Sequence, residues 1–206
     1  HRDLHSFPTR RSSDLCYVLG SRIVELSTEL NLEITALCDW NRQRVNDALQ
    51  HLKTQCTLHE LGWAGTIEGT TDYKELIDNE RVDLILITTH TDQHREPAIY
   101  ALQSDKHVYL DKPISVTLED SQEIIETEKK TGNALIMGFT RRYERPWRKV
   151  HELLNQGSIG TLQMMQIRSI IPYTRYLQMW HRNPQFSGGA LNDKSSHHLD
   201  VFNWLA

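Results

Sequence analysis

The sequence has neither an excess of basic residues nor a long apolar run, the two features that would point to nucleic acid or membrane as a partner. Its 23 lysines and arginines are outnumbered by 27 aspartates and glutamates, giving a net charge of −4, so no basic surface for nucleic acid is expected. No apolar run approaches the roughly 18 residues that a membrane-spanning helix needs. With 206 residues and 38% hydrophobic content, the chain can still form a core. We therefore expect a soluble globular protein that binds neither nucleic acid nor membrane.

Cysteine is also scarce. The three cysteines, Cys16, Cys38 and Cys56, are odd in number and lack the paired spacing of a zinc site. This pattern favours reduced thiols that serve in packing, because disulfide frameworks belong to oxidising compartments. It predicts a cytoplasmic protein with no metal site.

The first 15 residues lack any regular period. They show neither helical nor strand spacing and have no apolar core for a secretory signal. The stretch resembles translated sequencing-adapter DNA, so we expect it to lie outside the fold and to have replaced native residues. A natural basic tail is the alternative.

Glycine is missing where a dinucleotide-binding unit would need it. Residues 16–30 have helical spacing, and 34–38 read as a buried strand closed by Asp39. In a βαβ unit such an acid binds the adenosine ribose, and a GxGxxG turn comes before the helix. Here Gly20 is the sole glycine in this region. Asp39 is therefore either a ribose ligand or a capping acid at the strand end, and Arg42 and Arg44 would tolerate a 2′-phosphate.

From there to residue 139, predicted strands and helices alternate. Residues 82–89 form the most apolar run, which predicts a parallel strand buried on both faces. Further helices are expected at 42–53, 71–77, 95–103 and 117–130, and a last strand at 134–139. Right-handed crossovers then give an α/β fold, a Rossmann-type doubly wound parallel sheet over 16–139 whose first strand and glycine-rich turn are missing.

Lys112 stands where one of these strands ends. Val108, Tyr109 and Leu110 favour a strand, and Pro113 ends it because proline cannot donate to the ladder. The carboxyl edge of such a sheet is where ligands bind. Lys112 is thus either a ligand-facing residue or a solvated strand end.

Residues 140–206 read as the beginning of an α+β domain. A helix is expected at 147–156, a turn at 157–160 and a strand at 161–171 with a bulge at 164–165. A final helix begins near Ser195, with its buried side supplied by Leu199, Phe202 and Leu205. Asp193 and His197 lie four residues apart, so the acid can fix the imidazole tautomer. A capping aspartate beside a surface histidine pair is the alternative.

Four motifs together resemble the Gfo/Idh/MocA oxidoreductase family over residues 16–206. They are the polar turn at 88–94, the strand and Asp111-Lys112-Pro113 at 106–113, the run 138–143, and Gly188-Gly189 followed by Asp193, His197 and Asp200. The resemblance implies a Rossmann domain that holds NAD or NADP, a second α/β domain, a sugar, polyol or inositol substrate, and a homo-oligomer. Three departures are the absent glycine fingerprint, His90 in place of proline, and Ser195 in place of glycine.

The resemblance also implies roles for single residues. The catalytic residues would be Lys112, Asp193 and His197, the cofactor would contact Gly20, Asp39, Arg44, Thr89, His94 and Lys112, and the substrate would contact Arg142, Tyr143 and Trp180. Tyr176 is a further sugar contact on this basis, although arginines and aromatic residues at such positions also serve in packing.

The expected reaction is hydride transfer between nicotinamide and a carbinol carbon. His197 would be the general base, Asp193 would orient it, and Lys112 would bind the reacting oxygen or take the proton itself. A glycosidase that uses NAD transiently is one alternative. A non-catalytic dinucleotide-binding or sensor protein is another.

Overall fold

The computed structural model describes residues 10–170 and 182–206, and the side chains from Leu19 onward. The chain begins with α1 (Arg10–Leu30), a 21-residue helix packed against α2 (Arg42–Leu58). Val24, Leu52, Cys56 and Ile67 form the buried core of this part. Residues 10–15 are thus helical although they are predicted to lie outside the fold, since extending an existing helix adds one hydrogen bond for each residue fixed.

Two short parallel strands lie beside these helices. β1 (Ala36–Cys38) pairs with β2 (Glu68–Thr70), with Ala36 opposite Glu68. The 3-10 helix η2 (Gly62–Thr66) leads into β2, and α3 (Tyr73–Ile77) follows it. Asp72 caps α3 by accepting a hydrogen bond from the Lys74 amide at 2.9 Å.

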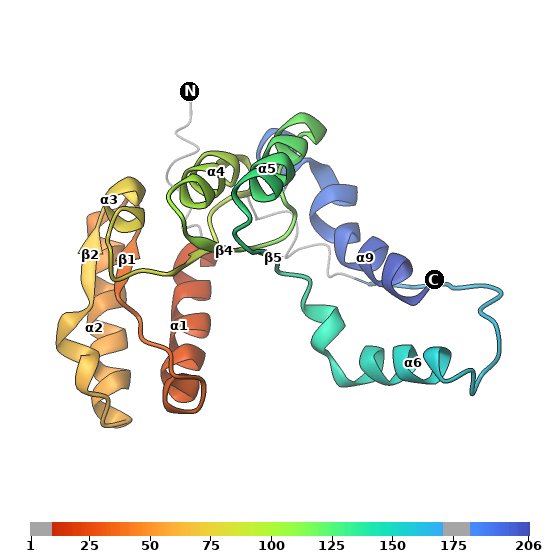
Figure 1. The fold of residues 1–206 in the computed structure, drawn as a ribbon, viewed down its shortest axis with the longest axis horizontal. Coiled ribbons are helices and arrows are strands. Elements are labelled where there is room, and N and C mark those ends of the chain that lie inside the picture. The colour runs from red at the N-terminus through yellow and green to blue at the C-terminus, as the bar shows by residue number, and fades with distance from the viewer. Residues whose placement is uncertain (1–9, 171–181) are drawn as a thin grey trace.

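A second parallel sheet has the order β3-β4-β5. Its strands are β3 (Leu84–Ile87), β4 (His107–Leu110) and β5 (Leu135–Met137). The connections are η3 (Thr91–Gln93) with α4 (Arg95–Gln103), and α5 (Leu118–Thr131). Both α4 and α5 cover the same face of this sheet (Figure 1).

Local signals account for the bounds of α5. The Thr117 hydroxyl accepts a hydrogen bond from the Asp120 amide at 3.1 Å and caps the first turn. Gly132 ends the helix at φ 75°, a left-handed conformation in which a side chain would be strained. The helix predicted at 117–130 is therefore confirmed to within one residue at each end.

The sheet differs from the prediction in one respect. Side chains on β3 alternate between buried and exposed, with Leu84 42% and Leu86 39% exposed, so this strand is not buried on both faces. Among residues 10–170 and 182–206, no strand joins the β1-β2 pair to β3-β4-β5. The general doubly wound fold has the strand order 3-2-1-4-5-6. In that order the β1-β2 pair corresponds to strands 2 and 3, and the β3-β4-β5 sheet corresponds to strands 4, 5 and 6, on the other side of the central strand 1.

The remaining regular elements of the described chain are helices. They are η4 (Thr140–Tyr143), α6 (Arg145–Asn155), α8 (Pro184–Ser187), the π-helical turn η6 (Leu191–Ser195) and α9 (Ser196–Leu205). Residues 161–170 form no strand, so that prediction is wrong for its described part; these residues pair with none of the described strands. None of the described helices is long and apolar enough to cross a membrane.

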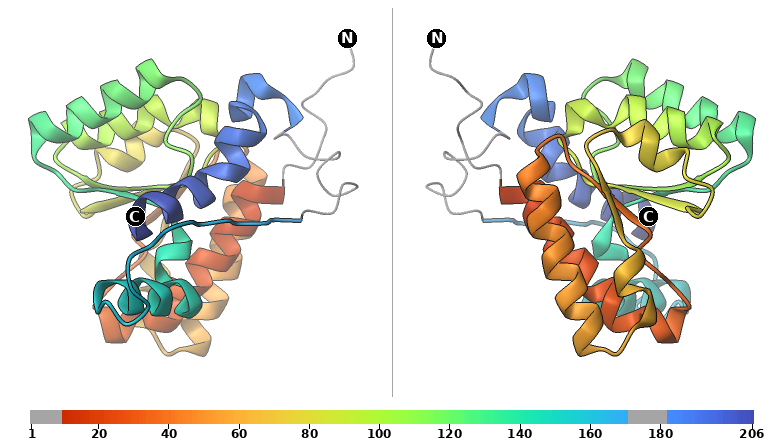
Figure 2. Two further views of the ribbon diagram at one scale, coloured as in Figure 1. Left: turned by 90° about the vertical axis from the view of Figure 1, so that its right-hand side faces the viewer. Right: turned by 90° about the vertical axis from the view of Figure 1, so that its left-hand side faces the viewer.

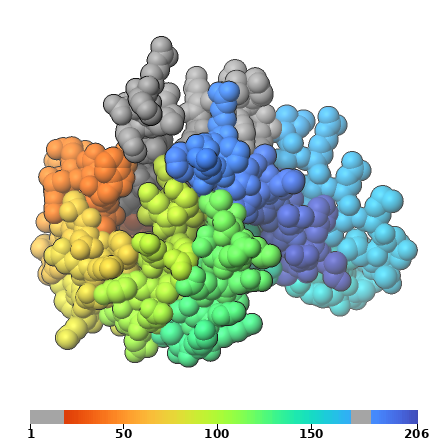
Figure 3. All heavy atoms as spheres, turned by 90° about the horizontal axis from the view of Figure 1, so that it is seen from above, coloured from red at the N-terminus to blue at the C-terminus, as the bar shows by residue number. Residues whose placement is uncertain are grey.

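The last helices return to the carboxyl edge of the second sheet. Figures 1 and 2 show α9 lying between α5 and α6, and α8 packs on η3. The space-filling view shows the blue segment that contains α8 and α9 directly against the green segment of α4 and α5 (Figure 3). Residues more than 80 positions apart in sequence are thereby brought to one edge.

Candidate active site

Lys112 is buried at the end of β4, with 8% of its surface exposed. Its Nζ lies 3.1 Å from Asp193 Oδ1 and donates to the Asp193 carbonyl oxygen at 2.5 Å. Asp193 is itself 1% exposed, and its second carboxylate oxygen lies 3.2 Å from Lys194 Nζ. Lys112 is therefore not a solvated strand end, because a buried charge is held by a counter-charge.

The turn η6 carries Asp193 to this position. Its neighbour Asn192 donates from Nδ2 to the Ser115 carbonyl at 2.9 Å, three residues after Lys112. Gly188, at φ 71°, allows Asn192 to approach closely: a β-carbon on Gly188 would lie 2.3 Å from Asn192 Nδ2. Gly188 of the motif thus permits the contact that brings Asp193 to the sheet.

His197 lies in the first turn of α9 and is partly buried. Burial lowers its pKa to about 4, and the positive charges of Lys112 and Arg141 act in the same direction. Its Nδ1 atom is buried and has no hydrogen-bond partner among the described residues. At neutral pH the imidazole is therefore uncharged and can accept a proton.

Asp193 has a partner that the sequence pattern did not assign to it. The structure pairs its carboxylate with Lys112, a contact that helical spacing cannot predict because the two residues lie far apart in the sequence. Orientation of His197 by Asp193 stays a prediction. What the structure adds is that the buried Lys112–Asp193 pair and the partly buried His197 lie at the same sheet edge, where β4 and β5 end.

His94 joins the ends of β3 and β4. Its Nδ1 lies 2.9 Å from the Pro113 carbonyl oxygen and its Nε2 3.2 Å from that of Thr89. The side chain is 1% exposed, and burial lowers its pKa. The two contacts link the backbone after β3 to the backbone after β4. Direct cofactor contact by Thr89 and His94 stays a prediction.

Asp39 directly follows β1, where an acid can cap the turn or bind a ribose. Its Oδ1 accepts from the Asn41 amide at 2.8 Å, and its Oδ2 lies 3.9 Å from Arg44 Nη1. The Arg44 guanidinium stands 5.5 Å from the centroid of the Trp40 ring, which is 67% exposed. Both interpretations of Asp39 fit this geometry. Burial lowers the pKa of His90, which follows β3, and the nearby charge of Arg44 acts in the same direction while that of Asp39 opposes it. The ends of β1 and β3 therefore lie near each other.

Gly20 has a different setting from the one expected of a cofactor residue. It is buried inside α1, where a β-carbon would lie 2.8 Å from Leu52 Cδ2 on α2. The absence of a side chain allows these two helices to pack closely, which accounts for the glycine without a ligand.

The residues predicted to contact the substrate differ in their surroundings. Arg142 forms an ion pair with Asp200, with Nη2 2.6 Å from Oδ1 and Nε 2.9 Å from Oδ2. Tyr143 is 70% exposed. Trp180 and Tyr176 lie outside the described residues. Asp200 is the residue whose importance the sequence understated: its place three positions after His197 was the available signal.

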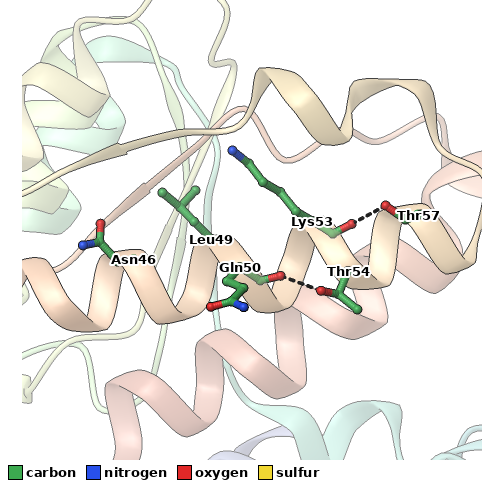
Figure 4. A pocket seen from close by; sticks show the side chains of 6 residues that line it. All are labelled: Asn46, Leu49, Gln50, Lys53, Thr54 and Thr57. Atoms are coloured by element: carbon green, nitrogen blue, oxygen red, sulfur yellow. Dashed lines mark hydrogen bonds between the residues drawn. The ribbon is translucent and has the colours of Figure 1, made fainter.

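A shallow groove on α2 is lined by Asn46, Leu49, Gln50, Lys53, Thr54 and Thr57 (Figure 4), none of which belongs to the cluster around Lys112.

The Leu199 side chain, predicted to be buried, is 55% exposed, whereas Asp200 is 8% exposed. The buried side of α9 is therefore rotated toward Arg142.

Parallel strands with helical crossovers, an acid after β1 and a buried lysine at the carboxyl edge define the class as a nucleotide-binding α/β domain. Comparison with known families assigns it further. Residues 19–139 match the "Oxidoreductase family, NAD-binding Rossmann fold" and residues 151–206 match the "Oxidoreductase family, C-terminal alpha/beta domain". The chain belongs to the Gfo/Idh/MocA oxidoreductase family.

Curated relatives include two inositol dehydrogenases. Inositol 2-dehydrogenase of Salmonella typhimurium is 29% identical over 180 residues, covering 87% of this chain and 48% of the relative. Myo-inositol 2-dehydrogenase of Thermotoga maritima is 32% identical over 141 residues, covering 68% and 41%. The chain spans about half the length of the first of these relatives.

Solved structures agree on the fold. A probable dehydrogenase from Thermotoga maritima has a TM-score of 0.70 at 26% identity, covering 88% of this chain and 51% of that chain. Scyllo-inositol dehydrogenase from Lactobacillus casei, solved with NAD(H) and scyllo-inositol, has a TM-score of 0.75 at 22% identity and covers 92% and 52%. At this lower identity the likeness concerns the fold alone.

Proposed function

We propose that this chain belongs to an NAD(P)-dependent dehydrogenase that acts on a hydroxyl group of an inositol-like polyol. The observation that supports this most is the buried Lys112–Asp193 pair, in one cluster with the neutral imidazole of His197, at the carboxyl edge of the sheet. The relatives named above are dehydrogenases, so they lend no support to the glycosidase or the sensor. Cytoplasmic location and homo-oligomeric assembly stay predictions.

The residues present fit one end of a dinucleotide. The Asp39 carboxylate stands at the end of β1, where it can accept hydrogen bonds from ribose hydroxyls, and Arg44 beside it can meet a 2′-phosphate. The described residues before β1 offer no glycine-rich turn for the pyrophosphate. When bound, nicotinamide would supply the two-electron acceptor for the hydride.

The roles of the protein residues follow from their charge states. The Lys112 ammonium donates a hydrogen bond to the reacting oxygen and stabilises negative charge that develops on it. His197, uncharged at neutral pH, accepts the hydroxyl proton. Asp193 holds Lys112 in place through the 3.1 Å contact. Alternatively Lys112 takes the proton, which would require it to lose its charge first.

The test is turnover of myo-inositol, scyllo-inositol and a sugar panel with NAD⁺ and NADP⁺, followed by nicotinamide absorbance. We expect Lys112→Met and His197→Asn each to lower kcat by about 10² to 10⁴. Lys129→Met, an exposed lysine on α5, is the matched control and should match wild type. Near wild-type rates for both site variants would refute the assignment. Sugar release from an aryl glycoside without net NADH would favour the glycosidase, and binding of NAD(H) without turnover would favour the sensor.

A further inference from the structure

Arg142 contacts α9 at two positions. Its guanidinium makes the paired hydrogen bonds to Asp200 and lies 5.8 Å from the centroid of the Trp204 ring, one helical turn further on. His151 of α6 stacks on the same ring at 4.3 Å. Arg142 is thus held against α9 by charge and by an aromatic face.

Asp200 is a buried carboxylate whose described hydrogen bonds all come from this arginine. It is 8% exposed and lies 58 residues from Arg142 in sequence. A buried charge without a partner is costly, so α9 is stable in this orientation only while the pair is formed. The pair therefore ties α9 to η4, which directly follows β5.

The same helical segment is anchored a second time. Asp193, four residues before His197, is held by Lys112 at the end of β4, and Asp200, three residues after His197, is held by Arg142. His197 and Asp200, three residues apart within α9, lie next to each other on the surface of that helix. His197 is bracketed by two ion pairs to neighbouring strand ends.

We propose that Arg142 is a positioning residue, whose ion pair with Asp200 holds α9 so that His197 stays beside Lys112. This differs from the substrate contact predicted for Arg142. The part that concerns catalysis rests on the proposed function, whereas the placement of His197 can be measured without turnover.

The experiment compares Arg142→Gln, Arg142→Lys, Asp200→Asn and the double variant Arg142→Gln/Asp200→Asn. Since a displacement of about 1 Å can cost 10²-fold in rate, we expect kcat to fall about 10- to 100-fold for each neutralised variant, with smaller changes in the KM for polyol. The double variant should be no worse than either single variant, and Arg142→Lys should recover part of the rate. Arg148→Gln, an exposed arginine of α6, is the control.

A second readout is the NMR signal of the His197 imidazole. It should shift in Arg142→Gln and in Asp200→Asn but stay in place in Arg148→Gln. If only the KM for polyol rises, about tenfold, with kcat and the His197 signal unchanged, Arg142 is a substrate contact and the proposal is overturned. If the wild-type protein turns over no polyol, the proposed function fails, and the imidazole signal still decides whether Arg142 positions His197.

Discussion

The Lys112–Asp193 pair makes a strong prediction about stability. Its side chains are 7% and 1% exposed, and removal of one partner from such a pair costs about 3–5 kcal/mol because the other charge stays buried. Lys194 remains 3.2 Å from Asp193 after Lys112→Met, so we expect the lower end, about 3 kcal/mol. For a chain of this size that is about 6–12 °C in Tm.

The assay is urea unfolding followed by circular dichroism, with the free energy of unfolding compared among variants. The double variant Lys112→Met/Asp193→Leu should recover most of the loss, because an apolar replacement of both partners leaves no unpaired charge in the interior. Lys194 also loses Asp193 in this variant, but its side chain is 22% exposed and can reach solvent. Lys194→Met should cost about 1 kcal/mol or less, because Asp193 still has Lys112 as its counter-charge. The reasoning would be refuted by a Lys112→Met protein within about 1 kcal/mol of wild type, or by a double variant no more stable than the single one.

Two further predictions concern His197 and the helix cap of α5. Because its pKa is lowered to about 4, His197 stays an available base down to that pH, and its favourable contribution to stability is present above 6.5 and lost as the pH falls toward 4. Arg141→Gln removes a positive charge that lowers this pKa, so the acid limb of the pH profile of kcat/KM should move to higher pH; an unchanged limb would contradict the assignment of His197 as the base. Thr117→Ala should destabilise the protein by about 1 kcal/mol in urea unfolding. Thr57→Ala should cost clearly less, because the Thr57 hydroxyl donates to the Lys53 carbonyl within α2 and caps no helix end. Equal losses would contradict the capping role of Thr117.

Local sequence patterns predicted most elements of the Rossmann part. The helix expected at 95–103 is observed as α4 (Arg95–Gln103), and the caps at Asp72 and Thr117 lie where short-range rules place them. These succeed because capping and helical spacing involve residues within one turn of each other.

The errors occurred where an element depends on distant parts of the chain. The apolar run around Leu84 and Leu86 suggested burial on both faces, but cover for a sheet face comes from helices elsewhere in the sequence. The strand predicted at 161–171 fails over its described residues for a similar reason, since a strand forms only with a neighbour to pair with.

For the candidate site, the sequence by itself determined which residues are present and their local order: a lysine before a proline at a strand end, and Asp193, His197 and Asp200 at helical spacing. Only the tertiary structure decided their partners. Lys112 meets Asp193 across 81 residues, and Arg142 meets Asp200 across 58. Such pairings arise from how helices return to the sheet edge, where burial forces each charge to find a counter-charge, and that information lies in the packing rather than in any one stretch of the chain.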